Sequence, residues 1–156
     1  MKEQPILLVE DNPKDVILTL RALNKSNLVN EIVVARNGIE ALDYLFATGK
    51  YAGRNVNELP AVVLLDLKLP KVDGFEVLRR IRADVRTRLL PVVVITSSSE
   101  EKDLNACYEL GANNYITKPV AFSDFSTVIS SIGCYWTLTT DHPQKMEHSE
   151  LGSCIE

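Results

Sequence analysis

Five polar side chains in this sequence follow short apolar runs and could together handle a phosphoryl group. They are Glu10, Asp11, Asp66, Thr96 and Lys118. Three carboxylates held close together need a compensating cation, and carboxylate oxygens favour Mg²⁺ or Mn²⁺ over Zn²⁺. One carboxylate could act as a nucleophile, while the hydroxyl and the ammonium stabilise the anion that it attacks. The set is suited to phosphoryl transfer if the fold brings it to one place.

Asp66 ends the most apolar of these runs. Residues 61–65 predict a buried parallel strand, and Pro70, Asp73 and Gly74 break the extended pattern soon afterwards. Such a strand places its last residue at the edge of the sheet where α/β folds bind ligands. An aspartate that only ends a strand in a turn is about as common, so the other polar residues must decide.

Five apolar runs alternate with five amphipathic segments. Strands are predicted at 6–9, 31–35, 61–66, 91–95 and 114–117. Helices are predicted at 13–23, at 38–46, from Asp73 through Ile81, from the serines at 97–99 to near Gly111, and at 122–136. This alternation predicts an α/β fold, a doubly wound five-stranded parallel sheet with helices on both faces. The carboxyl ends of its strands would gather the five polar side chains at one edge.

Capping residues and apolar spacing locate the helices more closely. Asn12 is a good N-cap ahead of Pro13, and Asp15 adds a negative charge to the first turn. Capping-box spacing occurs in three further pairs: Asp73 with Glu76, Ser97 with Glu100, and Ser98 with Glu101. The expected core-facing positions are Val16, Ile17, Leu20 and Leu23 in the first helix, Ile39, Leu42, Leu45 and Phe46 in the second, and Phe122, Phe125, Ile129, Ile132 and Trp136 in the last.

Length and composition fit one globular domain. The 156 residues are 46% hydrophobic and 24% charged, which suits a single domain with a full core. We assign residues 4–136 to this domain and residues 137–156, which lose the helical periodicity, to a flexible tail. The net charge of −4 argues against nucleic-acid binding. The three cysteines lack CxxC spacing, and neither a signal peptide nor a membrane-length apolar stretch is present, so the cytoplasm is the expected compartment.

The connection at 48–60 is longer than most loops between a helix and a strand. It is polar and contains two glycines and two asparagines. Two interpretations stay open. The segment is either a tolerated surface insertion or a loop that contacts a partner, because long ordered loops in compact domains are often functional.

The pairs Glu10-Asp11 and Lys118-Pro119, with Asp66 and Thr96, each at the end of a predicted strand, resemble the receiver domain of bacterial response regulators. The resemblance spans nearly all of 4–136. It implies a flavodoxin-like sheet with strand order 2-1-3-4-5. It also implies a phosphoacceptor module of two-component signalling, which assists its own phosphorylation and slow dephosphorylation, rather than an enzyme.

The resemblance implies a role for each residue around the metal. Asp66 would be the phosphoacceptor and a metal ligand, and Asp11 would bind Mg²⁺ directly. Glu10 would hold the ion through water, and the backbone carbonyl of Lys68 would complete the protein ligands. Many receivers have aspartate where this chain has Glu10, a change that keeps the charge and adds reach.

The resemblance also assigns the residues around the phosphoryl group. Thr96 would bond one phosphoryl oxygen and Lys118 would pair with another, and the peptide bond between Lys118 and Pro119 would be cis. Tyr115 occupies the family's aromatic switch position, together with Thr96. The alternative for Tyr115 is a half-buried strand tyrosine that does not move.

The long loop at 48–60 and the ending Trp136-Thr137-Leu138 resemble the single-domain regulators that partner phytochrome-type sensor kinases in cyanobacteria and other bacteria. This resemblance implies a sensor histidine kinase as phosphoryl donor, a downstream protein partner and no DNA-binding output. It also implies a homodimer through the fourth helix, fifth strand and fifth helix. Val128 and Tyr135 would add apolar area to that surface.

Other classes of protein fit the same residues less well. A Mg²⁺-dependent aspartate-nucleophile phosphohydrolase of the haloacid dehalogenase type would use Asp66, but it needs a second aspartate where this chain has Lys68. A flavodoxin would bind phosphate after the first strand, where Glu10 and Asp11 would repel it. A degenerate receiver would be expected to lose an acidic or lysine position, and this chain keeps them all.

Overall fold

Five parallel strands form the single sheet of the structure, a computed structural model that describes residues 4–25, 30–97 and 100–131. They are β1 Ile6–Val9, β2 Ile32–Ala35, β3 Val62–Asp66, β4 Val92–Thr96 and β5 Asn114–Thr117. Their order is β2-β1-β3-β4-β5, and every neighbouring pair is parallel. The predicted fold class and strand order are confirmed.

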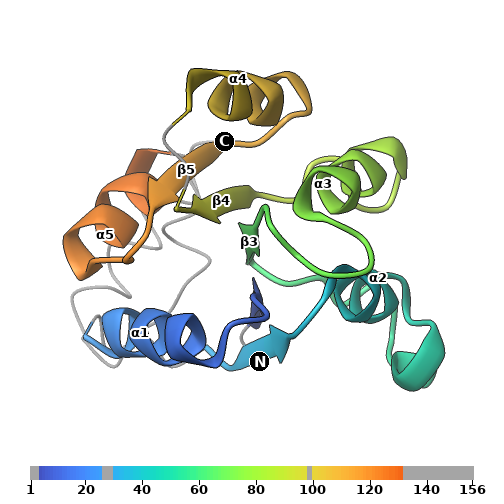
Figure 1. Ribbon diagram of the computed structural model, residues 1–156. Coiled ribbons are helices and arrows are strands. Elements are labelled where there is room, and N and C mark those ends of the chain that lie inside the picture. Colours follow the sequence, from blue (N-terminus) through green and yellow to red (C-terminus); the bar gives the residue numbers. More distant parts are fainter. Residues whose placement is uncertain (1–3, 26–29, 98–99, 132–156) are drawn as a thin grey trace, which may run out of the picture.

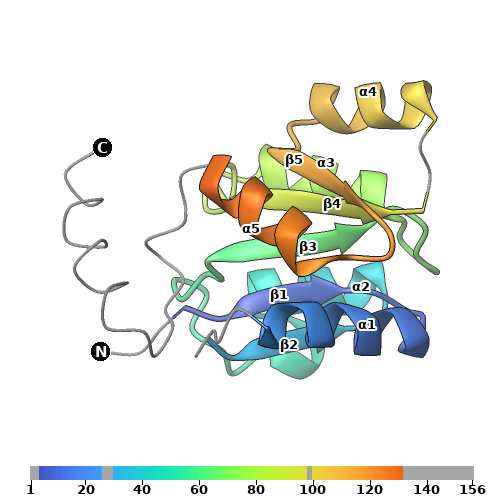
Figure 2. The same cartoon turned by 90° about the vertical axis from the view of Figure 1, so that its left-hand side faces the viewer.

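Helices cover both faces of this sheet. They are α1 Pro13–Asn24, α2 Gly38–Phe46, α3 Gly74–Ala83, α4 Glu101–Glu109 and α5 Phe122–Ser131, with a 3₁₀ turn, η1 Gly49–Tyr51, after α2. Figures 1 and 2 show α1 and α5 on one face and α2 and α3 on the other. Each helix runs back along the sheet, so all the loops that follow strands lie at the carboxyl edge.

The core has one half on each face of the sheet, and alternate residues of β3 supply both. Val63 and Leu65 pack with α2 and α3, whereas Val62 and Leu64 pack with α1 and with Phe125 of α5. All five residues of β3 and of β4 are buried. This continuous burial explains why both strands are apolar up to their last residue. Their polar ends at the carboxyl edge therefore stand out in the sequence.

Two residues that the helical spacing assigned to the core are exposed instead. Ile17 of α1 is 50% exposed and Ile39 of α2 is 43% exposed. In α2 the side that packs inward begins with Gly38, where an added Cβ would lie 2.0 Å from the carbonyl oxygen of Val72. Gly38 therefore faces the core and its neighbour Ile39 faces solvent. The sequence pattern counted only large apolar residues, so it assigned the inward position to Ile39.

The helix caps agree with the sequence in two helices and differ in a third. Asn12 accepts a hydrogen bond from the N–H of Lys14 at 2.9 Å. Asp73 accepts one from the N–H of Glu76 at 3.0 Å. The serine caps predicted for the fourth helix are wrong, because α4 begins at Glu101 with Glu100 in the N-cap position, and the Glu100 side chain makes no capping bond.

Several sequence-based expectations lie outside the described residues. They concern Ile132, Trp136 and the 137–156 tail, and the side chains of Phe122 and Ile129 within α5. Phe125 is buried as expected. Across the ranges that the structure describes, no helix is both long enough and apolar enough to cross a membrane.

Candidate functional site

The carboxyl ends of four strands bring the predicted polar side chains to one edge of the sheet. Asp66 and Thr96 are the last residues of β3 and β4. Glu10 follows β1, and its N–H donates to the carbonyl of Ala35 at 2.9 Å. Lys118 follows β5, and its N–H donates to the carbonyl of Thr96 at 2.8 Å. Backbone pairing therefore fixes where each of these side chains begins.

Glu10, Asp11 and Asp66 form a close group of carboxylates. One oxygen of each lies within 4.8 Å of the others. Glu10 is 1% exposed and Asp66 is 5% exposed, whereas Asp11 is open to solvent. Three carboxylate oxygens at this separation fit a hard divalent cation such as Mg²⁺ or Mn²⁺, and the exposed side gives the ion a route of entry.

Lys118 uses its ammonium group to join three carboxylates. Its Nζ lies 2.8 Å from Oε1 of Glu10, 2.9 Å from Oδ2 of Asp15 and 3.2 Å from Oδ2 of Asp66. An ammonium has three N–H donors, so one donor is available for each carboxylate. The Lys118 side chain is only 15% exposed, and in such surroundings these charge-assisted bonds are strong.

The loop between β3 and α3 folds back over the end of β3. The N–H of Lys68 donates to Oδ1 of Asp66 at 3.3 Å, and the N–H of Gly74 donates to the carbonyl of Leu67 at 2.9 Å. An added Cβ at Gly74 would lie 2.3 Å from the carbonyl oxygen of Asp66. Position 74 therefore requires glycine, because only glycine lets the start of α3 approach the residue that carries the central carboxylate.

Burial and mutual repulsion set the charge of this group. Desolvation raises the pKa of Glu10 from its usual 4.5 to about 7, with the negative charge of Asp66 adding to it and Lys118 opposing it. Burial alone would lower the pKa of Lys118, but its bonds to Glu10 and Asp15 outweigh that effect and raise it. Lys118 therefore stays charged. In the metal-free site the unfavourable electrostatics act mainly on Glu10, whose ionised form is disfavoured.

Comparison with known proteins decides the family. A model of the response regulator receiver domain matches residues 6–130. The chain belongs to this family.

Individual receivers are similar to the chain over most of its length. The probable methanogenesis regulatory protein FilR2 of Methanothrix harundinacea (strain 6Ac) is 44% identical over 84% of this chain and 82% of its own length. Response regulator Rcp1 of Synechocystis sp. (strain PCC 6803) is 38% identical over 88% of this chain and 92% of its own.

Two solved receiver structures superpose on the chain. The structure of the bacteriophytochrome response regulator AtBRR is 56% identical, covers 87% of this chain and 96% of its own, and has a TM-score of 0.80. The crystal structure of the Mn²⁺-bound form of Rcp1 is 37% identical, covers 86% and 94%, and has a TM-score of 0.70. Rcp1 thus holds a divalent cation in a receiver fold like this one.

Asp15 is a residue of the receiver site that the sequence analysis treated only as a first-turn charge. Its carboxylate is the third partner of the Lys118 ammonium. The signal that could have found it is its place in the first turn of α1, directly after the end of β1 that brings Glu10 and Asp11 to the carboxyl edge.

The remaining predicted residues of the receiver lie near this edge with different degrees of burial. Thr96 is buried, Lys68 is exposed on the β3–α3 loop, and the peptide bond between Lys118 and Pro119 is cis. Tyr115 is half-buried on β5, and its ring meets that of exposed Tyr108 edge to face at 6.1 Å. Tyr115 thus joins β5 to α4 at the surface.

Proposed function

We propose that this receiver accepts a phosphoryl group on Asp66 from a phosphohistidine of a sensor histidine kinase. The observation that carries the proposal is the Lys118 ammonium, which lies 3.2 Å from Oδ2 of Asp66 while Glu10 and Asp11 stand close by. A buried carboxylate held by a cation is ready to receive an anionic group, because the cation is already in place for the added charge.

The acidic group supplies the ligands for a metal ion. Asp11 and Asp66 would bind Mg²⁺ directly, Glu10 would bind it through water, and Lys68 would contribute its backbone carbonyl. Mg²⁺, or Mn²⁺ in its place, neutralises the carboxylates and the phosphoryl oxygens that would otherwise repel one another. The carboxylate geometry supports this ligand set, because one oxygen from each of three acids is already within 4.8 Å of the others.

The chain's own side chains then guide the transfer. A carboxylate oxygen of Asp66 attacks phosphorus, and the bond from phosphorus to the histidine nitrogen breaks with its electron pair on the imidazole. The Lys118 ammonium pairs with one phosphoryl oxygen, and to do so it must weaken its contact with Asp66 or Asp15. The Thr96 hydroxyl bonds a second oxygen. The product is an acyl phosphate on Asp66.

Output through protein contact completes the proposal. Movement of Thr96 toward the phosphoryl group would be passed to Tyr115, whose ring already touches Tyr108 on α4. The surface of α4, β5 and α5 is accordingly our candidate for the homodimer and for the downstream partner. Val128 and Tyr135, which the sequence analysis placed on this surface, have side chains outside the described set. We infer a phytochrome-type kinase in the cytoplasm as the donor, and the match to the bacteriophytochrome response regulator AtBRR supports the class of kinase.

Acetyl phosphate or phosphoramidate provides a direct test. With Mg²⁺ present, intact-mass spectrometry should show one added phosphoryl group per chain, and peptide mapping after trapping should place it on Asp66. A steady release of phosphate without an adduct would instead support the phosphohydrolase alternative. Purified phytochrome-type kinases and unrelated histidine kinases can then be compared as donors, with phosphotransfer in seconds expected only from the former.

A further inference from the structure

We propose that the outer edge of β2 and the hollow beside it bind an extended, basic segment of a partner protein. This site lies away from Asp66, toward the amino ends of the strands. It does not depend on the phosphorylation proposed above. Four properties of the described residues carry it: free backbone groups, a hollow that reaches both sides of the strand, a braced loop and an acidic lining.

The backbone of β2 offers hydrogen-bonding groups on its outer side. The carbonyls of Glu31 and Ala35 accept hydrogen bonds from β1. In a parallel ladder the residues between them face the other way, so Ile32 and Val34 direct their N–H and C=O groups outward. β2 is an edge strand, and no described backbone group pairs with these four groups. The next outward N–H, that of Arg36, is already bonded to the Glu40 carboxylate at 3.0 Å.

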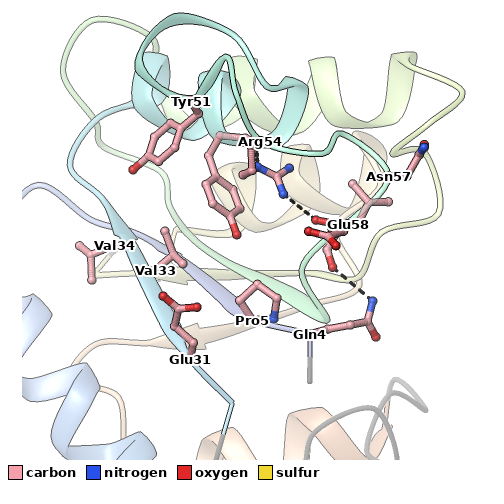
Figure 3. A pocket seen from close by; sticks show the side chains of 11 residues that line it. Gln4, Pro5, Glu31, Val33, Val34, Tyr51, Arg54, Asn57 and Glu58 are labelled. Carbon is pink, nitrogen blue, oxygen red and sulfur yellow. Dashed lines mark hydrogen bonds between the residues drawn. The ribbon is translucent and has the colours of Figure 1, made fainter. Parts of the chain in front are cut away.

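A hollow of about 710 Å³ lies along this edge. Val33 and Val34 both line it, although the first packs with the α2 side of the core and the second with the α1 side. The hollow therefore wraps around the edge of β2 and is not confined to one face. Figure 3 shows Glu31, just before β2, and Val33 on β2 facing Tyr51 and Arg54 of the 48–60 loop. An added strand would lie between them.

Arg54 braces the wall of the hollow. Its Nε donates to the carbonyl of Tyr44 at 2.8 Å, and its Nη1 donates to the carbonyl of Glu58 at 2.7 Å. The guanidinium lies 4.1 Å from the centre of the Tyr44 ring, and Tyr51 packs edge to face on the same ring at 5.1 Å. A loop held in this way needs little ordering when a partner binds, which favours affinity.

The lining of the hollow is acidic on its open side. Glu31 and Glu58 are exposed, and Arg54 is the only cation among the described residues that line it. Its guanidinium is held in the wall by two carbonyls and a ring, and with the two glutamates it leaves the lining with a net charge of −1. The complementary occupant is an extended segment with β-branched residues for the edge and lysine or arginine for the two glutamates.

Random heptapeptides displayed on phage provide the probe. Selection on the full chain should enrich β-branched peptides that carry lysine or arginine, and synthetic copies should bind in fluorescence anisotropy. Val34→Pro should weaken that binding at least tenfold, because it removes one outward N–H while leaving every β1–β2 bond in place. Val34→Ala, which keeps the N–H, is the matched control. Replacing Glu31 and Glu58 together by glutamine should weaken binding and reduce its salt dependence.

Amide hydrogen exchange of the unaltered protein gives an answer that does not depend on the variants. Added peptide should slow exchange at Ile32 and Val34 and leave Val33, whose N–H already faces β1, unchanged. A peptide that binds the hollow without pairing to the strand would not produce this alternation. The proposal is overturned if no peptide is enriched, if Val34→Pro binds as tightly as Val34→Ala, or if neither outward amide is protected.

Discussion

The two ends of the sheet use polar groups in opposite ways. At the carboxyl edge the Lys118 ammonium has a carboxylate for each of its three donors, and these acids lie just after β1, in α1 and at the end of β3. Beside β2, the outward backbone groups and the buried Nη2 of Arg54 have no protein partner among the described residues. A satisfied and buried network fixes a geometry for one reaction, whereas unpaired groups leave bonds for another molecule to make.

The largest expected effect is the loss of phosphorylation in a variant of the carboxyl edge that still folds. Asp66→Asn should abolish phosphoryl uptake, because an amide of nearly the same shape cannot attack phosphorus. Its thermal unfolding should change little or improve, since one charge that repels Glu10 is removed. Mass spectrometry with phosphoramidate and Mg²⁺ would measure the first effect, and phosphorylation at the wild-type rate would refute the assignment of Asp66.

Removal of the Lys118 ammonium should lower the free energy of unfolding more than any other single change at this edge. Lys118→Met keeps much of the side chain's bulk but leaves Glu10 and Asp66 buried without a counter-charge. We expect a loss of roughly 3 kcal/mol in the free energy of unfolding without metal at pH 8. Urea titration would measure it, with Lys118→Arg as the charge-preserving control. A loss below about 1 kcal/mol would mean that the network holds the fold less firmly than its geometry indicates.

The pKa of Glu10 predicts how the metal-free protein responds to pH. Burial, with the charge of Asp66, raises this pKa from 4.5 to about 7, so the folded chain binds the proton more tightly than the unfolded chain does. Stability should therefore fall as pH rises from 4.5 to 7, by roughly 3 kcal/mol, and level off above. Glu76 and Asp84, whose pKa values arginine neighbours lower to about 2, act only below this window.

Glu10→Gln is the control for that pH dependence. It removes the group whose raised pKa spans this window and should therefore flatten the curve between pH 4.5 and 7. Saturating Mg²⁺ should flatten it in the unaltered protein as well, since the ion favours the ionised carboxylate. Persistence of the full slope in Glu10→Gln would assign the effect to another group.

At the other end of the sheet, Arg54→Met should loosen the 48–60 loop without affecting phosphorylation. The change removes two hydrogen bonds to carbonyls and one ring contact, but it also removes the unpartnered buried Nη2. These effects partly cancel, so the expected loss of stability is only about 1 kcal/mol. Hydrogen exchange should speed up in the 48–60 segment, while phosphoramidate labelling should keep its rate. Slower labelling would show that the two ends are coupled.

The smallest effect on stability is expected from Asp11→Ala. Asp11 is exposed, so removing its charge should relieve repulsion by less than about 1 kcal/mol in the metal-free protein. The same change should remove most of the stabilisation that Mg²⁺ provides to the unaltered protein. Thermal melts with and without Mg²⁺ test both statements together. An undiminished Mg²⁺ shift would exclude Asp11 as a direct ligand.

The comparison of the two ends also explains what the sequence could predict. Asp66 and Thr96 end apolar runs, and parallel pairing necessarily places strand ends together, so their location follows from local patterns. The bond from Lys118 to Asp15 depends on side-chain reach across 103 positions of the chain, which no spacing rule encodes. The hollow beside β2 depends on how the 48–60 loop folds, and polar loop residues carry no periodic signal.

The outer edge of β2 has a further consequence for the behaviour of the chain in concentrated solution. An unpaired strand with apolar side chains can template contact between identical molecules and start aggregation. Here the strand is only four residues long, charged residues flank it at Glu31 and Arg36, and Glu40 occupies the last outward amide. These features limit edge-to-edge pairing of β2 between molecules. Glu40→Ala would free the N–H of Arg36 and so lengthen the unpaired edge of β2 by one amide. We expect the purified variant to aggregate faster than the unaltered protein during storage at high concentration.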